Sequence, residues 1–325
     1  MSNKITAVRF PDVSNDLGIC DVARVSFAKE ASQFPEDKNK GLIKYLKEHF
    51  HWAPMGQARF TLKGFIETSE LLRFLCNANM AGFKFSHNPD IFKNGWAPDE
   101  LELNGSVWAF WENKEFVPWS FLVAAEAYIK ANYPWFWEFS FATMTVFNRE
   151  VSEVRVVPPA ECSVKTRCVS LRGEAPIYVV RQLGKHQVGL TWNEVSRRYV
   201  DTAPEHFDIT DWRAKPLPGQ TKQGSSHSLD KSLQESINLL VRDLRGPSDD
   251  LYEYLTEHLK VSAEQARSVL LQDMQTEWIW TGGILDFKRV CKERLAPTAQ
   301  KETKGFAEQV DNILREEIGE LWDTL

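Results

Sequence analysis

The spacing of apolar residues along the chain predicts a mixed α/β fold. Residues 4–10 (KITAVRF) alternate between apolar and polar positions, as a half-buried strand does. Residues 40–50 instead predict an amphipathic helix whose stripe contains Leu42, Tyr45, Leu46 and His49. The same criteria predict further strands at residues 60–63 and 167–172 and further helices at residues 16–27, 175–185, 229–244, 285–294 and 299–314.

Capping and breaking residues indicate where some of these helices begin or end. Asn15 or Asp16 is a suitable N-cap for the first helix. The Gly-Pro pair at residues 246–247 is expected to stop the helix predicted just before it. Residues 262–265 (SAEQ) match a capping box and predict a helix that continues to residue 274.

Composition and charge describe an ordinary globular protein. The chain has 325 residues, of which 43% are hydrophobic and 26% charged, enough for one large domain or two. Its net charge of −6 argues against a nucleic-acid partner, because such proteins usually carry a basic surface. There is no run of 18 apolar residues and no basic-then-apolar leader, so a cytoplasmic protein without a membrane partner is expected.

The five cysteines predict neither a zinc site nor a disulfide framework. They are scattered along the chain and contain no C-x-x-C pair. Cys291 falls on the apolar stripe of the helix predicted at residues 285–294, where it is expected to be a small buried hydrophobe. No metal site is therefore predicted.

Two segments show little periodicity. Residues 201–230 are rich in Gly, Pro, Ser and Lys, which fits either a mobile linker or a loop that gates a site. Residues 64–166 are rich in aromatic side chains without basic residues between them, which favours packing over base stacking. A faint echo of WIWTGGILDF in ELNGSVWAFW leaves a decayed duplication open. Six of the twelve tryptophans lie in this second segment: Trp96, Trp108, Trp111, Trp119, Trp135 and Trp137.

A dense polar cluster at residues 181–199 (RQLGKHQVGLTWNEVSRRY) is the strongest functional signal. It follows the apolar segment APIYVV, and Gln182, Lys185 and His186 would share one face of a helix. A polar set that continues a buried run is expected to line a cavity, and its cations and hydrogen-bonding groups suit phosphates and a polar heterocycle. The alternative is an exposed helix end followed by a charged loop.

The cluster resembles the signature of the flavin-dependent thymidylate synthases, the ThyX family. The family pattern is R-Q-x-x-R-H-R, a short spacer and N-E-x-S-x-R-Y, and this chain has RQLGKHQ followed by NEVSRRY. Lys185 and Gln187 replace two arginines of the pattern. Residues 15–27, 41–62 and 266–302 also look like family segments, and they occur in the family's order.

The resemblance implies a fold, an activity and a set of partners. The fold would be the α+β (mixed α/β) ThyX fold with an insertion of roughly 100 residues: 1–63 and 167–325 would form the catalytic domain, and 64–166 the insertion. The enzyme would methylate dUMP at C5 to dTMP, with methylenetetrahydrofolate as carbon donor, reduced FAD as hydride donor and NADPH as co-substrate. The family forms homotetramers. The alternatives are a relative that places another one-carbon group on a pyrimidine nucleotide and a nucleotide-binding homologue without flavin chemistry.

The resemblance also assigns roles to individual residues. Arg294 follows Phe287 and Cys291 on an apolar helical stripe, where a cation needs an anion or a strong acceptor, so it is either a substrate ligand or a structural ion pair. The family match makes it the catalytic arginine that contacts the uracil ring. The residues implied to bind dUMP are Gln182, Lys185, Glu194, Ser196, Arg197, Arg198, Arg267 and Arg294. Those implied to bind FAD are Ser26, His51, Lys185, His186, Gln187, Asn193, Glu194, Gly283 and Arg289.

Overall fold

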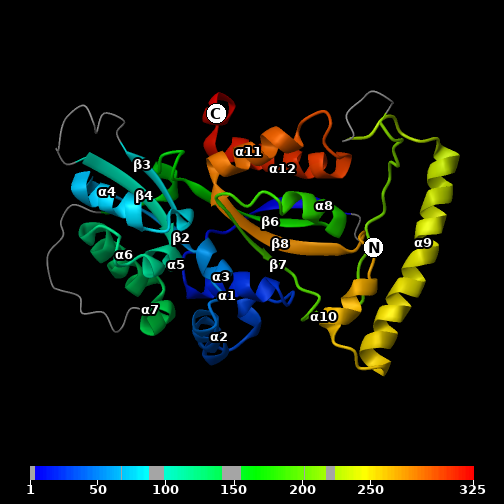
Figure 1. Cartoon of the computed structure of the whole chain (residues 1–325), viewed down its shortest axis with the longest axis horizontal. Coiled ribbons are helices and arrows are strands. Elements are labelled where there is room, and N and C mark those ends of the chain that lie inside the picture. The colour runs from blue at the N-terminus through cyan, green and yellow to red at the C-terminus, as the bar shows by residue number, and fades with distance from the viewer. Residues whose placement is uncertain (1–3, 67, 88–98, 141–154, 201, 217–223) are drawn as a thin grey trace.

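Two antiparallel sheets form the framework of the molecule (Figure 1). The computed structural model describes residues 4–66, 68–87, 99–140, 155–200, 202–216 and 224–325. The first sheet has the order β1 (Thr6–Phe10), β6 (Cys168–Pro176), β8 (Gln275–Gly283), β7 (Leu190–Glu194). The second has the order β3 (Phe83–His87), β4 (Asp99–Ser106), β2 (Arg59–Ile66), β5 (Arg155–Val157). The predicted mixed α/β class is confirmed.

Helices cover both faces of the first sheet, because the central strand β8 is buried on both sides. Trp280 of β8 packs against Phe287, with ring centroids 5.3 Å apart. The next residue back along the strand, Ile279, points to the opposite face and joins the core that contains Ile19 and Met55. The first face is covered by α8 (Ile177–Leu183), α11 (Ile284–Arg294) and α12 (Lys301–Ile318), and the second by α1 (Asp16–Val25) and α3 (Ala53–Gln57). α2 (Glu36–Glu48) packs on α1, and α13 (Leu321–Thr324) follows α12.

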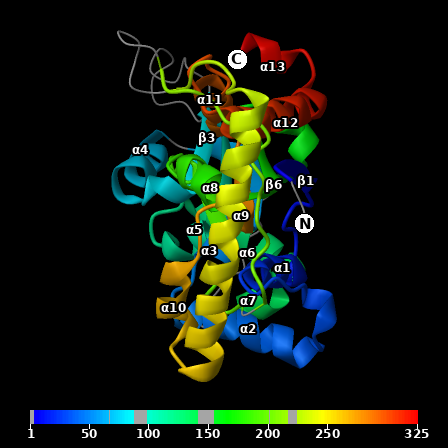
Figure 2. The same ribbon diagram turned by 90° about the vertical axis from the view of Figure 1, so that its right-hand side faces the viewer.

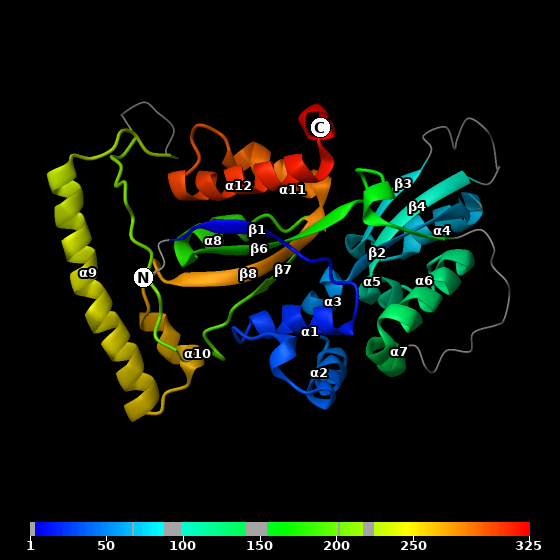
Figure 3. The same cartoon turned by 180° about the vertical axis from the view of Figure 1, so that it is seen from behind.

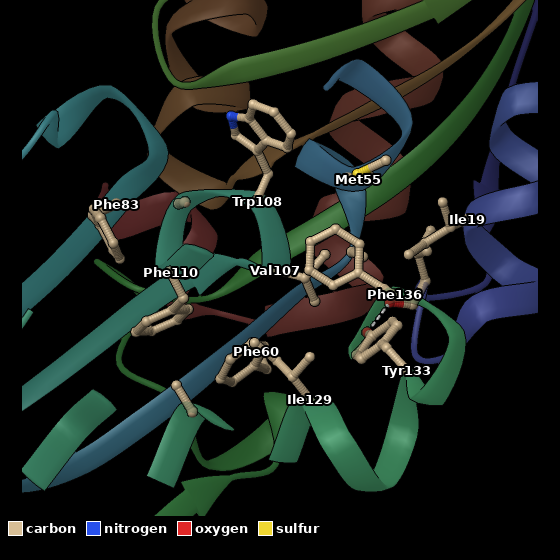
Figure 4. Close-up of a cluster of buried hydrophobic side chains, with 14 of the residues drawn as sticks. Ile19, Met55, Phe60, Phe83, Val107, Trp108, Phe110, Ile129, Tyr133 and Phe136 are labelled. Atoms are coloured by element: carbon tan, nitrogen blue, oxygen red, sulfur yellow. Dashed lines mark hydrogen bonds between the residues drawn. The ribbon is translucent and has the colours of Figure 1, made fainter. Parts of the chain in front are cut away.

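The second sheet packs against its own helices through aromatic side chains (Figure 4). Phe110 stacks on Phe60 with centroids 4.8 Å apart and meets Phe83 edge-on at 5.2 Å. The helices are α4 (Thr68–Asn77), α5 (Val107–Glu112), α6 (Trp119–Asn132) and α7 (Pro134–Ser140). The prediction that the tryptophans serve packing is confirmed for Trp108, Trp111, Trp135 and Trp137, which lie in or against the core, whereas Trp119 is 39% exposed and Trp96 lies outside the described residues. The boundary expected at residue 63 falls inside β2, so this sheet begins before it.

The two sheets are built as a repeat. The order β2-α4-β3-β4-α5-α6 recurs as β6-α8-β7-β8-α11-α12, except that the second repeat carries further helices between β7 and β8. Every strand pairing is antiparallel in both repeats. Gly105 lies opposite Phe83 in one repeat, as Gly282 lies opposite Leu190 in the other. A Cβ at either glycine would overlap that partner, at 2.7 Å from the Phe83 ring or 2.3 Å from Leu190. The structure therefore supports the duplication that the segments GSVWAF and GGILDF suggest.

The outer strands of the two repeats are exchanged. β1 precedes the first repeat in the chain but pairs with β6 of the second, side by side in Figure 3. β5 leads into the second repeat but pairs with β2 of the first. The exchange ties the two sheets together, because each sheet is completed by a strand that belongs, in sequence, next to the other.

Two helix predictions need correction. α9 (Lys231–Glu253) continues through Gly246 and Pro247, because Arg245 is anchored to Asp208 at 2.6 Å and the Ser248 hydroxyl donates to Val269 O at 2.9 Å. These contacts compensate for the backbone hydrogen bond that proline removes. The helix expected from residue 262 to 274 ends as α10 (Ala263–Ala266), followed by a 3₁₀ turn and then β8.

Other boundaries agree or shift slightly. Asn15 caps α1 by accepting from Gly18 N at 2.9 Å, as predicted. α9 lies in front of the other elements in Figure 2 and is followed by a π-helical turn at Tyr254–His258. Within the described ranges, no helix combines the length and the apolar character needed to span a bilayer.

The close packing of β6 on β8 can be tested with glycine substitutions. A Cβ at Gly173 would lie 2.4 Å from the Trp278 ring, so Gly173→Ala should destabilise the fold by about 1–3 kcal/mol through overpacking. Gly41 of α2 has open space around its Cβ position, so Gly41→Ala should stabilise by roughly 0.5–1 kcal/mol through helix propensity. Urea unfolding of both variants measures the difference, and equal midpoints would contradict the packing.

Candidate functional site

The polar cluster of the sequence begins on a helix, continues through a strand and ends in the turn after it. α8 ends at Leu183, Gly184 is its C-cap, and the chain turns before β7 begins at Leu190. Gln182 is therefore helical, whereas His186 lies in the turn, where its N–H donates to Leu183 O at 3.0 Å. The single helical face predicted for Gln182, Lys185 and His186 does not form.

The turn nevertheless brings Gln182 and His186 together with Arg294. The Arg294 Nε–H donates to His186 Nε2 at 2.9 Å, and Nη2 donates to the carbonyl oxygen of Gln182 at 3.1 Å. The end of α11 thus meets the end of α8. The side chain of Gln182 is itself fixed by Gln300 and by Thr303, whose hydroxyl lies 3.4 Å from Gln182 Oε1. We call Gln182, His186 and Arg294 the arginine cluster.

The arginine cluster requires a neutral histidine. Because arginine always donates, His186 Nε2 must accept, which leaves the ring proton on Nδ1. Burial lowers the pKa of His186 below its usual value, and the positive charge of Arg294 lowers it further. Glu293, whose Oε2 lies 3.9 Å from His186 Nε2, acts in the opposite direction.

β7 divides its functional residues between the two faces of the sheet. Asn193 points toward α1, where its amide donates to Val22 O and lies 3.4 Å from the Ser26 hydroxyl. Ser26 in turn donates to Glu194 O at 3.0 Å. The Glu194 side chain points the other way, as alternation along a strand requires, and accepts from Trp192 Nε1 at 3.1 Å and from the Thr276 hydroxyl at 3.2 Å. Burial raises the pKa of Glu194 above its usual value.

A second group of cations lies beyond the end of β7. Arg198 Nε donates to the Ser196 hydroxyl at 3.2 Å, and its Nη1 lies 3.9 Å from Glu264. Arg267 donates to the backbone carbonyl of Glu264 at 3.3 Å. Both arginines are exposed, so they are available to a ligand. We call Ser196, Arg198 and Arg267 the phosphate-side cluster.

Arg197 does not join this cluster. Its guanidinium donates to Thr202 O, on the side of Asp249 and Tyr252, and burial lowers its pKa. The structure therefore separates Arg197 from Arg198, with which the sequence grouped it.

A cavity of about 670 Å³ lies between the turn before β7 and the first repeat. We call it the signature-loop cavity. Phe50, Trp52 and Trp108 supply aromatic surface, and Arg59 and Lys84 supply positive charge. Residues 187–191 line its other side, including the predicted Gln187. In the sequence His51 stands between Phe50 and Trp52, but its side chain is exposed beside Tyr45. The side chain of Lys185 is exposed as well.

An ion-pair network joins the first repeat to this turn. Lys84 pairs with Asp286, whose side chain is 7% exposed and also accepts from Gly283 N at 3.0 Å. Asp286 pairs with Arg289 at 2.9 Å, and Arg289 donates to Val188 O at 2.7 Å. Sequence reasoning named Gly283 and Arg289 but missed Lys84 and Asp286. An acid three residues after a glycine at a helix start was the only available signal for Asp286, and nothing local indicated Lys84.

Gly189 has a backbone reason to be glycine. Its φ is +75°, and a Cβ there would lie 2.4 Å from the Asp286 carboxylate. The network and this close approach together fix the turn that carries His186 and Gln187.

The protonation state of the arginine cluster can be tested directly. Burial, Arg294 and Arg289 all lower the pKa of His186, and Arg294→Met removes one of these causes, so the His186 titration midpoint should rise toward the ordinary value. Because the folded pKa is depressed, the neutral imidazole adds stability above the unfolded pKa, and that contribution is lost as pH falls through the folded pKa. Imidazole NMR through an acid titration, with His186→Gln for assignment, gives the midpoints. An unchanged midpoint in Arg294→Met would show that the contact is absent in solution.

Comparison with known proteins finds relatives of this chain. A family model described as thymidylate synthase complementing protein matches residues 167–318. The flavin-dependent thymidylate synthase of Aquifex aeolicus is 26% identical over 317 residues, which cover 93% of this chain and 95% of that protein. A Thermus thermophilus enzyme of the same name is 31% identical over 149 residues, which cover 46% of this chain and about half (53%) of that relative.

A looser match is found among solved structures. The UMP/dUMP methylase PolB from Streptomyces cacaoi, bound with 5-Br UMP, aligns over 97% of this chain and 90% of its own at 13% identity and a TM-score of 0.45. The matched family segment, residues 167–318, contains α8, β7, β8 and α11, and with them the arginine cluster and the phosphate-side cluster. Residues 167–318 therefore match the thymidylate synthase complementing protein family, and the chain is similar over almost its whole length to a flavin-dependent thymidylate synthase.

Proposed function

We propose that the protein methylates dUMP at C5 to form dTMP, with a reduced flavin as hydride donor. The arginine cluster is the observation that carries the proposal. The guanidinium of Arg294 uses two of its five N–H donors on Gln182 and His186. The remaining donors are held in a fixed plane by these two contacts, so they can bind the acceptor edge of a pyrimidine ring.

Arg294 acts on the charge that develops in the reaction. Hydride addition to the ring would place negative charge on O4 of the uracil, and a cation already held in place would stabilise that charge without reorganisation. His186 keeps Arg294 in position only while its ring is neutral, which its lowered pKa favours. No protein nucleophile is needed for this step. Burial raises the pKa of Cys291 to about 12, so that thiol stays protonated.

The phosphate-side cluster would bind the 5′-phosphate of dUMP. Charge-assisted hydrogen bonds from Arg198 and Arg267, with the Ser196 hydroxyl, suit a phosphate dianion. In one chain, the contacts of Arg294 stay with α8, whereas those of Arg198 stay with Ser196 and Glu264. We infer that one nucleotide is bound by clusters from two copies, which agrees with the homotetramer that the family resemblance implies.

The residues of the signature-loop cavity fit a flavin. Aromatic walls suit a planar ring system, and Arg59 and Lys84 suit a pyrophosphate. A bound reduced flavin supplies the hydride that completes the methyl group. Gln187, His186 and Arg289 would hold it from the turn side, with Asn193, Ser26 and His51 nearby. We propose FAD as the flavin, and methylenetetrahydrofolate and NADPH as co-substrates.

Flavin binding separates this proposal from a nucleotide-binding homologue without redox chemistry. α3 offers little to a flavin, because Gln57 is 1% exposed and accepts from the Thr281 hydroxyl at 2.8 Å. Cofactor contacts are therefore expected from the cavity rather than from α3. Protein purified with flavin should be yellow, with absorbance near ~450 nm, and product analysis by mass then identifies the group added at C5.

Nucleotide binding tests the phosphate-side cluster. Arg198→Ala should weaken dUMP binding by about 2–4 kcal/mol, because the 5′-phosphate loses the guanidinium with which it pairs. Arg315→Ala is a matched control, since Arg315 is an exposed arginine on α12 that pairs locally with Asp311 and Asp323. Calorimetry with dUMP measures both variants. If Arg198→Ala binds dUMP as the unaltered protein does, the phosphate assignment is wrong.

Turnover tests Arg294. Arg294→Ala should slow the chemical step by ~100–1,000-fold, the usual effect of removing one preorganised donor. The rate of Arg294→Lys should lie between those of the unaltered protein and Arg294→Ala, because lysine keeps the charge but loses the planar fork. Lys292→Ala, an exposed cation on the same helix, is the control. Single-turnover flavin oxidation with dUMP and thermal melting are measured on each variant. A destabilised Arg294→Ala protein with normal turnover would make Arg294 a structural residue.

A further inference from the structure

A second cavity, of about 520 Å³, lies between the two repeats, whose sheets lie next to each other in Figure 3. Residues of β2, β4, β6 and β8 form its walls, together with residues 12–14 and 156–159. We call it the inter-repeat cavity. Among the described residues that line it, only Arg59 also lines the signature-loop cavity, and none belongs to the arginine cluster or the phosphate-side cluster. Its volume lies in the range of small-molecule sites, about 300–1,000 Å³.

Equivalent positions of the two repeats line this cavity with polar side chains. In the β2–β4 ladder, Thr61 lies opposite Asn104 and accepts from its amide at 3.0 Å. At the same place in the β6–β8 ladder, Ser170 lies opposite Thr281, and their hydroxyl oxygens are 2.8 Å apart. All four side chains are buried. Because buried positions between packed sheets are usually apolar, a polar wall that both sheets supply indicates polar contents.

Two lining residues carry donors that have no acceptor in the described part of the chain. Gln57, which is 1% exposed, accepts from the Thr281 hydroxyl through Oε1, whereas its Nε2 makes no hydrogen bond. Arg167 donates from Nη2 to Glu317 at 2.8 Å, whereas its Nε makes none. Both residues line the cavity. A buried donor without an acceptor is costly, so a molecule in the cavity is expected to supply the acceptors.

The charges around these donors match a ligand with one negative charge. Asp12 pairs with Arg9 at 2.8 Å. Glu317 lies 3.6 Å from Arg9 and 2.8 Å from Arg167, so these two acids and two arginines are neutral together. Arg59 adds a positive charge to the lining, and its hydrogen bonds go to an amide oxygen and a backbone carbonyl, which do not neutralise it. A single carboxylate therefore fits this lining better than a phosphate dianion does.

The rest of the lining is largely apolar. The rings of Phe60 and Tyr128 lie with their centroids 4.5 Å apart, and Val157, Pro158 and Pro159 add aliphatic surface. A ligand that fills the cavity therefore needs an apolar body beside its carboxylate.

We propose that the inter-repeat cavity binds a small organic carboxylate, whose oxygens accept from Gln57 and Arg167 and whose apolar body packs against Phe60. The ligand contacts both halves of the molecule, because Gln57 lies just before the first repeat and Arg167 just before the second. Since the cavity exists only in the folded protein, the ligand stabilises the packing of one repeat on the other. The site has no part in the reaction proposed above.

Calorimetry with 2-naphthoate tests the cavity, because this probe joins one carboxylate to a flat apolar body. The unaltered protein should bind it saturably, and the uncharged analogue 2-naphthamide should bind at least about tenfold more weakly. Gln57→Met and Arg167→Met each remove one donor, so each should weaken 2-naphthoate binding roughly tenfold or more. Arg172→Met is the control, since Arg172 lies on β6, pairs with Glu277 at 2.8 Å and does not line the cavity. It should bind as the unaltered protein does.

Thermal melting confirms that each variant is folded. Gln57→Met carries the test if Arg167→Met fails to fold, because it leaves the ion pair with Glu317 intact. Absence of saturable 2-naphthoate binding, equal binding of both probes, or unchanged affinity in folded Gln57→Met would overturn the proposal and leave water as the content of the cavity.

Thiol protection locates the bound probe. Cys162 lines the cavity, whereas Cys76 is exposed on α4 and does not. At about ten times its Kd, 2-naphthoate should slow alkylation of Cys162 by iodoacetamide about tenfold, because only about a tenth of the chains remain free. Alkylation of Cys76 should keep its rate, and peptide mass spectrometry measures both. Equal rates at Cys162 with and without the probe would contradict the assigned site. Neither experiment uses dUMP or flavin, so its outcome is independent of the proposed reaction.

Discussion

The antiparallel ladder between β6 and β8 is the constraint on which the arginine cluster depends. Its nine pairs run from Cys168 opposite Gly283 to Pro176 opposite Gln275. β6 therefore connects to α8 at one end of the ladder, and β8 connects to α11 at the other end. Both helices fold back over the same face of the sheet, so their C-terminal ends approach each other. With seven and eleven residues they extend roughly 10 and 16 Å, and Arg294 closes the remaining gap to Gln182.

The sequence predicted the elements whose signals are local. The helix at residues 285–294 and the Asn15 cap were found because apolar period and cap chemistry lie within a few residues. β8 was missed because it is buried on both faces, and β7 because all five of its residues are half-buried, so neither strand shows alternation. The extension of α9 through Pro247 was missed because the contacts that stabilise it come from Asp208 and Val269, which are distant in sequence.

The same distinction applies to the candidate site. Gln182, His186 and Arg294 were named from the family pattern, and the structure brings them together. The separation of the arginine cluster from the phosphate-side cluster could not be predicted, because it depends on where β7 runs in the sheet. Lys84 could not be predicted either, since it reaches Asp286 from the other repeat. What appeared to be an insertion is one half of a repeated architecture, and that relation is visible in strand order and register rather than in residue identity.

The exchange of outer strands has a consequence for how the chain is made. β1 leaves the ribosome first, yet its partner β6 is about 160 residues further along the chain, as the contact between Arg9 and Ser170 illustrates. During synthesis β1 cannot pair with β6 until the chain has been translated through residue 176. Such long-range pairing slows folding and prolongs the exposure of unpaired edges. The first repeat is also incomplete until β5 is made, so each sheet gains its outer strand only from the segment that precedes the other repeat in the chain.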